Sequence, residues 1–221
     1  MVNMLFSLYN FHEHWAKDVV AKYINYKDKV LIIPFSFGDK MKNHMDWHNA
    51  YDKECGTYYK SVVVPFLSYG VKEENISWIN YFKDTKESAK DKIENSDVIF
   101  FTGGLPDKMM CRLEEFDLIN DIKNFTGIVI GSSAGAMIQL EEYHITPDKD
   151  YDVFSYNRGL SLIKDFGIEV HYEETELQNT CIRKVLNERV DIVYEIKDNG
   201  GIIVDNDSIV LLGDVRAFSE K

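Results

Sequence analysis

The stretch IVIGSSAGAM (residues 128–137) decides the fold, because an apolar run ends in five small residues and then continues in a helical pattern. Gly131, Ser133 and Gly135 match G-x-S-x-G, the motif in which a strand turns sharply into a helix and displays the serine hydroxyl. The glycines allow a crowded turn. The stretch therefore predicts a nucleophile elbow at Ser133. The alternative is a tight strand-to-helix turn whose serine has no chemical role.

Short apolar segments alternate with helical patterns along the chain. The predicted strands span residues 29–37, 76–82, 97–104, 127–133 and 167–172. The predicted helices span approximately residues 11–26, 42–58, 85–96, 107–124, 134–142 and 173–189. This alternation is typical of an α/β fold with a mostly parallel sheet and helices on both faces. Two apolar runs within residues 200–213, separated by Asp-Asn-Asp, predict a C-terminal β-hairpin.

Nothing in the sequence marks a domain boundary. The 221 residues include only four prolines, and no Pro-rich or Ser-rich linker, internal repeat or low-complexity tract is present. The chain is 45% hydrophobic and 28% charged, with 13 Tyr and 13 Phe, so it can bury a substantial core. We therefore expect a single α/β domain over residues 1–221.

Charge and cysteine content limit the partners and the compartment. Thirty-seven acidic and 25 basic residues give a net charge of −12, which disfavours binding to nucleic acid or to anionic membranes. The three cysteines, Cys55, Cys111 and Cys181, form no C-x-x-C pair, so neither a disulfide framework nor a zinc ribbon is indicated. Residues 1–15 lack the pattern of a secretion signal, and no later run is long enough to cross a bilayer. We expect a cytoplasmic, unprocessed protein.

A serine nucleophile needs a general base, and the chain has six histidines. His171 ends the predicted strand 167–172, and functional groups in such sheets gather where strands end. His144 follows the elbow helix and is a weaker candidate. His44 and His48, four residues apart, would share a helix face and could bind a metal, but no third ligand is evident, so a solvated helix face is favoured.

The sequence pattern alone does not identify the acidic residue that would complete a triad with the serine and the histidine. Acidic candidates are abundant: Asp148, Asp150, Asp152, Glu195 and Asp198. An oxyanion hole needs backbone N–H groups directed at the developing charge. One is expected from Ala134, directly after the nucleophile, and the glycine-rich turn in FFTGGLP (residues 100–106) is placed to supply another.

Three segments in this order resemble peptidase family S51, which includes aspartyl dipeptidase (peptidase E) and cyanophycinase: FFTGG (100–104), GSSAGAM (131–137) and GIEVHY (167–172). The resemblance runs from about residue 29 to the C-terminus. It implies a flavodoxin-like, doubly wound sheet related to that of class I glutamine amidotransferases. It also implies a Ser-His-acid triad that hydrolyses peptide bonds.

Carried across residue by residue, the resemblance makes Ser133 the nucleophile and His171 the base, with Gly103 and Gly104 in the oxyanion loop. The segment VYEIKDNGGIIV (193–204) resembles the part of the family that carries the triad glutamate. Asp198 matches that position, so Asp replaces Glu there. Glu195 and Asp148 remain alternatives for the acid.

The chain departs from the family at positions that contact substrate. Gln178 stands near the arginine with which aspartyl dipeptidases bind an acidic side chain, and Arg183 is the nearest remaining cation. Leu105 replaces a frequent asparagine, and Tyr172 replaces the phenylalanine after the histidine. A preference for N-terminal aspartate is therefore not implied.

Together these observations predict a cytosolic serine peptidase, of the exopeptidase or dipeptidase type, acting on small peptides without cofactor or metal. A homo-oligomer is compatible with this prediction. The alternatives are a non-catalytic ligand-binding or interaction protein of the same fold, and an amidase or esterase for small substrates. Glutamine amidotransfer is disfavoured because the elbow carries Ser133 rather than cysteine.

Overall fold

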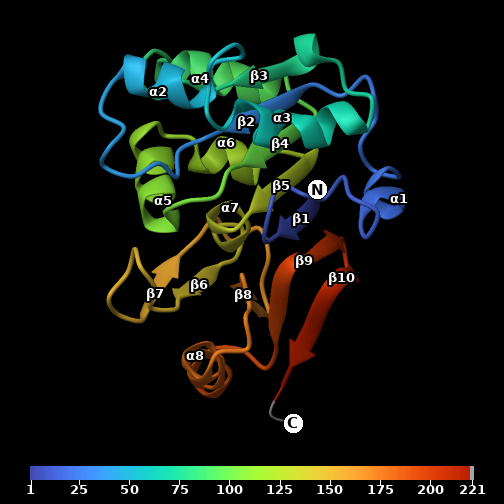
Figure 1. Ribbon diagram of the computed structural model, residues 1–221, viewed down its shortest axis with the longest axis vertical. Helices are drawn as coiled ribbons and strands as arrows, with labels where there is room; N and C mark the ends of the chain where they lie inside the picture. The colour runs from blue at the N-terminus through green and yellow to red at the C-terminus, as the bar shows by residue number, and fades with distance from the viewer. Residues whose placement is uncertain (220–221) are drawn as a thin grey trace.

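A computed structural model describes residues 1–219 (Figure 1). The strands are β1 (Val2–Phe6), β2 (Val30–Ile33), β3 (Ile76–Trp78), β4 (Val98–Phe101), β5 (Ile128–Ser132), β6 (Glu142–Ile145), β7 (Ser155–Arg158), β8 (Gly167–Val170), β9 (Val193–Asp205) and β10 (Ser208–Phe218). The α-helices are α1 (Lys17–Val20), α2 (His44–Tyr51), α3 (Tyr59–Ser68), α4 (Lys86–Glu94), α5 (Pro106–Glu115), α6 (Ile119–Lys123), α7 (Ala134–Met137) and α8 (Glu176–Glu188), and a 3₁₀ turn, η1, spans Glu73–Asn75. None of the described helices has the length and apolar character needed to cross a membrane.

The central sheet is eight-stranded and mostly parallel. Its strands follow the order β10-β9-β1-β5-β4-β2-β3, and β8 pairs with β9. Parallel pairing joins β1, β5, β4, β2 and β3, whereas β9 runs antiparallel to both β1 and β10. The predicted α/β fold with a C-terminal β-hairpin is confirmed.

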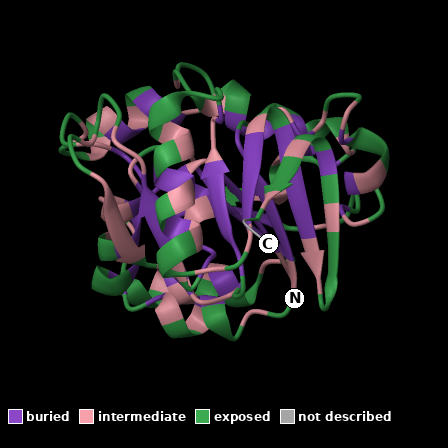
Figure 2. Ribbon diagram, turned by 90° about the horizontal axis from the view of Figure 1, so that it is seen from below, coloured by how far each residue is buried: buried purple, intermediate pink, exposed green. Residues whose placement is uncertain are grey.

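Central strands direct alternate side chains into two hydrophobic cores, one on each face of the sheet. Leu31 and Ile33 belong to the core that includes residues of α4 to α7, whereas Val30 and Ile32 belong to the core that includes α1 and α3. All four side chains are fully buried, and Figure 2 shows the central strands buried along their length. Strands covered on both faces account for the nearly continuous apolar runs in the sequence.

One strand of the central sheet, β1, and one helix that packs against the sheet, α3, were not predicted from the sequence. β1 lies between β5 and β9 and is formed by residues for which no strand was predicted. α3 forms although it contains three consecutive valines and Pro65. Its Val62, Val63 and Phe66 are buried against the sheet, and this burial outweighs their low helix propensity.

Several predicted boundaries are wrong. The helix predicted over residues 134–142 ends at Met137, after which the chain enters β6, and β6 and β7 form a separate two-stranded sheet. Only residues 17–20 of the helix predicted over 11–26 are α-helical. The helix predicted over 107–124 is divided at Asp117, whose φ is 57°. The hairpin starts earlier than predicted because β9 begins at Val193.

Strands approach the centre of the molecule from two directions. β4 and β5 run parallel to β1, whereas β9 is antiparallel to β1 and parallel to β8. β8 therefore runs in the direction opposite to β5. The carboxyl end of β8 consequently faces the carboxyl ends of β4 and β5. A single cleft is lined by residues that follow all three of these strands: Gly104, Ser133 and His171.

Candidate active site

Ser133 lies in the turn between β5 and α7 in a strained backbone conformation. Its φ is 52° and its ψ is −115°, a region that costs a non-glycine residue on the order of 1–3 kcal/mol. Its N–H donates to the Phe6 carbonyl at 2.8 Å. A Cβ on Gly131 would lie 2.0 Å from the carbonyl oxygen of Gly135, so only glycines permit this approach of strand and helix. The surrounding backbone thus holds Ser133 in the geometry expected of an elbow.

His171 follows β8 in a left-handed conformation, with a φ of 51°. Its N–H donates to Ser7 Oγ at 3.1 Å, and the Ser7 hydroxyl donates to the Ile196 carbonyl at 2.8 Å. Gln178 Nε2 donates to the His171 carbonyl at 3.0 Å, and Gln178 Oε1 accepts the Glu173 N–H at 2.9 Å. These bonds fix the turn that carries the imidazole.

Asp198 is the acidic candidate that contacts the imidazole. Its Oδ1 lies 3.0 Å from His171 Nδ1, and the two side chains are 63% and 43% exposed respectively. Glu195 is buried beside Tyr172 instead, and desolvation raises the pKa of its carboxyl group. Asp148 Oδ1 accepts the backbone N–H groups of Asp150 and Tyr151 in its own loop.

The glycine turn after β4 lies beside the serine. A Cβ on Gly103 would lie 3.3 Å from the Ser133 Cβ, and the Gly103 N–H donates to the Tyr9 hydroxyl at 2.7 Å. Burial raises the pKa of Tyr9 to about 12, which keeps the phenol neutral. The N–H groups of Gly104 and Ala134 donate to no acceptor among the described residues. These two N–H groups are therefore the ones left for an oxyanion.

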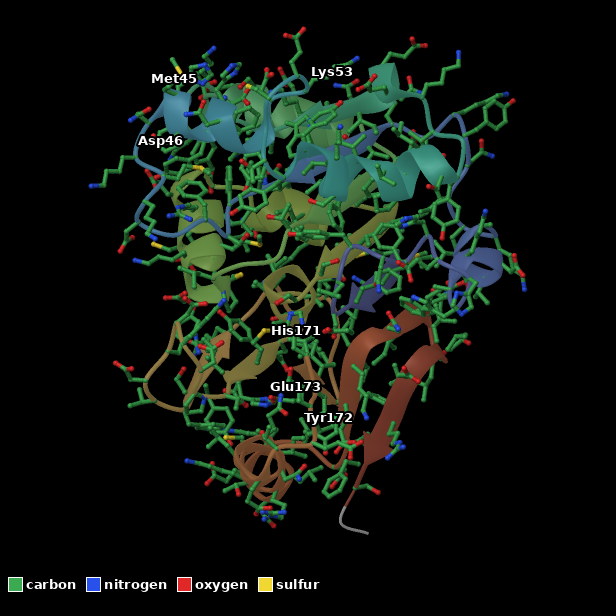
Figure 3. The ribbon with its side chains drawn as sticks, in the orientation of Figure 1. Met45, Asp46, Lys53, His171, Tyr172 and Glu173 are labelled. Atoms are coloured by element: carbon green, nitrogen blue, oxygen red, sulfur yellow. The ribbon has the colours of Figure 1, made fainter. Side chains whose placement is uncertain are left out.

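Ser133, His171 and Asp198 line one cleft of about 760 Å³. Figure 3 shows His171 and Glu173 between the sheet and α8. No hydrogen bond joins the Ser133 hydroxyl to His171 among the described residues. Catalytic hydrogen bonds are often long before substrate binds, so this separation is compatible with a triad that tightens on binding.

A second cavity of about 720 Å³ lies between β6 and α8. No serine, threonine or cysteine is among the described residues that line it, so it lacks the nucleophiles of serine, threonine and cysteine peptidases. The cleft at Ser133 is therefore the better candidate for an active site.

His144 is engaged in a buried pair. Its Nε2 lies 2.7 Å from Glu169 Oε2, both residues are buried, and the Thr146 hydroxyl donates to the same oxygen at 2.9 Å. This pairing occupies the imidazole and leaves His171 as the better-placed base. Cys181 is buried nearby, and burial raises the pKa of its thiol, which disfavours the reactive thiolate.

Residues just after β1 make contacts that sequence reasoning missed. Ser7 binds the His171 turn, Tyr9 binds the Gly103 turn, and Asn10 Nδ2 donates to the Asp198 carbonyl at 3.2 Å. The available signal was the run at residues 2–6, apolar apart from Asn3, which is compatible with a strand that ends just before Ser7.

Comparison with known proteins identifies the family of this chain and supports its fold. The model of peptidase family S51 matches residues 16–212. The chain belongs to peptidase family S51. This S51 chain is similar to a candidate peptidase E protein from Listeria monocytogenes EGD-e, with a TM-score of 0.66 and 18% identity over 95% of this chain and 96% of that one. It is also similar to a peptidase from an acI-B1 Actinobacterium, with a TM-score of 0.60 and 15% identity over 99% of this chain and 93% of that one.

No curated protein sequence matches this S51 chain at a significant level. The two structural neighbours show that the fold is shared, and membership of the S51 family supports a peptidase activity.

Proposed function

We propose that this S51 family member is a serine peptidase that hydrolyses small peptides as an exopeptidase or dipeptidase. One observation carries the proposal: the strained Ser133 shares a cleft with His171, whose Nδ1 lies 3.0 Å from Asp198. A serine at a strand-to-helix turn, a histidine and an acid that orients it are the parts that acyl transfer requires.

The contact to Asp198 defines the role of each imidazole nitrogen. Nδ1–H donates to the carboxylate, which leaves Nε2 to accept the proton of the Ser133 hydroxyl. Oγ then attacks the substrate carbonyl carbon, and the N–H groups of Gly104 and Ala134 stabilise the resulting oxyanion. Protonated His171 passes its proton to the leaving amine. Water, deprotonated by the same imidazole, then releases the acyl group from Ser133.

A preference for an acidic substrate side chain would require a cationic side chain in or beside the cleft. Both amide atoms of Gln178 hold the His171 turn, and Arg183 Nη2 is 2.8 Å from Glu176 on the exposed side of α8. Neither residue is placed to bind an acidic substrate side chain as the arginine of aspartyl dipeptidases does. Lys149 is the one lysine or arginine among the described residues that line the cleft, and it is outnumbered there by the carboxylates of Asp148, Glu169, Glu173 and Asp198. We therefore expect no preference for N-terminal aspartate.

The test is hydrolysis of a dipeptide panel that includes Asp-X, Ala-X and Lys-X members. We expect turnover by the wild type and a loss of at least about 10³-fold in Ser133→Ala. Ser132→Ala is the matched control, because Ser132 precedes the elbow and its hydroxyl donates to the Leu8 carbonyl at 3.0 Å. Equal turnover by Ser133→Ala and the wild type would refute the proposed nucleophile.

A non-catalytic, ligand-binding protein of the same fold is the second candidate. It is favoured by the 63% exposure of Asp198 and by the missing hydrogen bond between Ser133 and His171. Saturable binding of dipeptides without turnover, unchanged in Ser133→Ala, would support this function. Turnover of small amides or esters, but not of peptides, would instead identify an amidase or esterase.

A further inference from the structure

Three side chains with different donor atoms converge at the C-terminal end of α2. His48 lies in the last turn of the helix, Asp52 is its C-cap, and Cys55 lies in the turn that follows. Cys55 Sγ is 3.7 Å from His48 Nε2 and 3.5 Å from Asp52 Oδ1, and one ligand atom from each residue lies within 4.8 Å of the others. Asp52 and Cys55 supply the additional ligands that were not evident from the spacing of His44 and His48.

The distances from Cys55 Sγ to the other two ligand atoms fit a tetrahedral metal site, and the remaining pair, His48 and Asp52, meets through Nδ1 and Oδ2 at 3.2 Å. Zinc binds cysteine sulfur at about 2.3 Å and histidine nitrogen or carboxylate oxygen at about 2.0–2.2 Å. Two ligands at those lengths and a tetrahedral angle are separated by about 3.5 Å. The two distances from Cys55 Sγ are close to this value before any ion is considered.

The backbone fixes the ligands in place. Asp52 N–H donates to the His48 carbonyl at 2.9 Å, and Gly56 N–H donates to the Asp52 carbonyl at 2.8 Å. Asp52 Oδ1 also accepts the N–H groups of Glu54 and Cys55. The helix itself is anchored by a small aromatic cluster whose buried members include Trp47 and Tyr51. Little ordering is therefore needed for the three groups to bind a common ion.

We propose that His48, Asp52 and Cys55 form a Zn²⁺-binding site whose fourth ligand is water. A thiolate and an imidazole favour zinc over the hard cations Mg²⁺ and Ca²⁺, which prefer all-oxygen sites. In the metal-free chain the Cys55 thiol donates its hydrogen to Asp52 Oδ1. Zinc takes the place of that proton, which is released to solvent, and the sulfur binds as thiolate.

Neighbouring groups define the limits of the site. His44 is on the same helix, but its Nδ1 lies 3.2 Å from Asn80 Nδ2 and its ring centroid is 6.2 Å from that of His48, so it is outside the ligand set. Figure 3 shows Met45, three residues before His48, and Lys53, next to Asp52, well away from His171. Zinc at this position would join α2 to the loop that leads into α3, independently of the peptidase chemistry.

The test is a titration of the full chain, without affinity tag and with its thiols reduced, first with Co²⁺ and then with Zn²⁺. We expect one Co²⁺ per chain, with the visible bands of a tetrahedral ion and a thiolate charge-transfer band that Zn²⁺ abolishes. Cys55→Ser should remove the charge-transfer band and weaken Zn²⁺ binding by about 100-fold or more. Cys111→Ser is the matched control, because Cys111 is also an exposed cysteine but lies outside the cluster.

A second measurement separates zinc binding from misfolding of a variant. Zn²⁺ should raise the Tm of the wild type and of Cys111→Ser but not that of Cys55→Ser, whose Tm without zinc should equal that of the wild type. Zinc affinity unchanged in Cys55→Ser, or octahedral Co²⁺ spectra without a charge-transfer band, would overturn the proposal.

Discussion

Ser7→Ala tests how the molecule positions its candidate base. The Ser7 hydroxyl is buried, donates to the Ile196 carbonyl and accepts the His171 N–H. After the substitution the carbonyl still accepts the Tyr172 N–H at 3.1 Å, so only the His171 N–H loses its partner. An unpaired buried donor costs about 1–3 kcal/mol, and a cost of about 2 kcal/mol lowers the Tm of a chain of this length by about 4–8 °C.

The same variant should lose activity because the turn that carries the imidazole is less well fixed. We expect kcat to fall by about 10-fold while KM changes little, since Ser7 is outside the substrate cleft. The measurements are thermal unfolding and dipeptide hydrolysis. Ser68→Ala is the control, because Ser68 is exposed on α3 and its hydroxyl donates to a carbonyl within that helix. A Ser7→Ala protein with wild-type Tm and kcat would refute the positioning argument.

Three further predictions concern the acid and the elbow. Asp198→Asn should lower kcat about 100-fold because the imidazole loses its charged partner. Glu195→Gln should leave kcat unchanged. Equal losses of kcat in the two variants would show that the acid is not the carboxylate nearest to His171. Burial raises the pKa of Glu195, so the stability it contributes is present below its unfolded pKa and is lost as pH rises through the folded pKa. Glu195→Gln should therefore raise the Tm at pH 7 but not at pH 3.5, and an equal effect at both pH values would contradict this. Gly135→Ala should destabilise by several kcal/mol because its Cβ would lie 2.2 Å from a backbone oxygen, whereas Gly38→Ala, with its nearest contact at 3.6 Å, should keep the wild-type Tm.

The fold was predictable where the hydrophobic pattern was strong. Fully buried parallel strands give continuous apolar runs, so β2, β4 and β5 were found together with the elbow. β1 was missed because the polar Asn3 interrupts its short apolar run. α3 was missed because its valines and proline oppose a helix locally, and only packing against the sheet stabilises it.

The candidate site was predictable to the extent that its residues follow local motifs. Ser133 and His171 were identified because each stands at a strand end, and both line the same cleft. Which acid contacts His171 depends on the long-range pairing of β8 with β9, in which Val170 lies opposite Ile196. Ser7, more than 160 residues away in sequence from the turn it binds, carries no local signal of that contact.

The most direct test of Ser133 as the nucleophile is covalent labelling of the wild-type protein by a fluorophosphonate probe, read as intact mass. We expect one adduct per chain, mapped to Ser133 by peptide analysis, and no adduct in Ser133→Ala or His171→Ala. Ser132→Ala should label as the wild type does. Labelling that persists in Ser133→Ala, or a wild type that hydrolyses dipeptides without ever reacting at Ser133, would contradict the claim that this serine is an activated nucleophile.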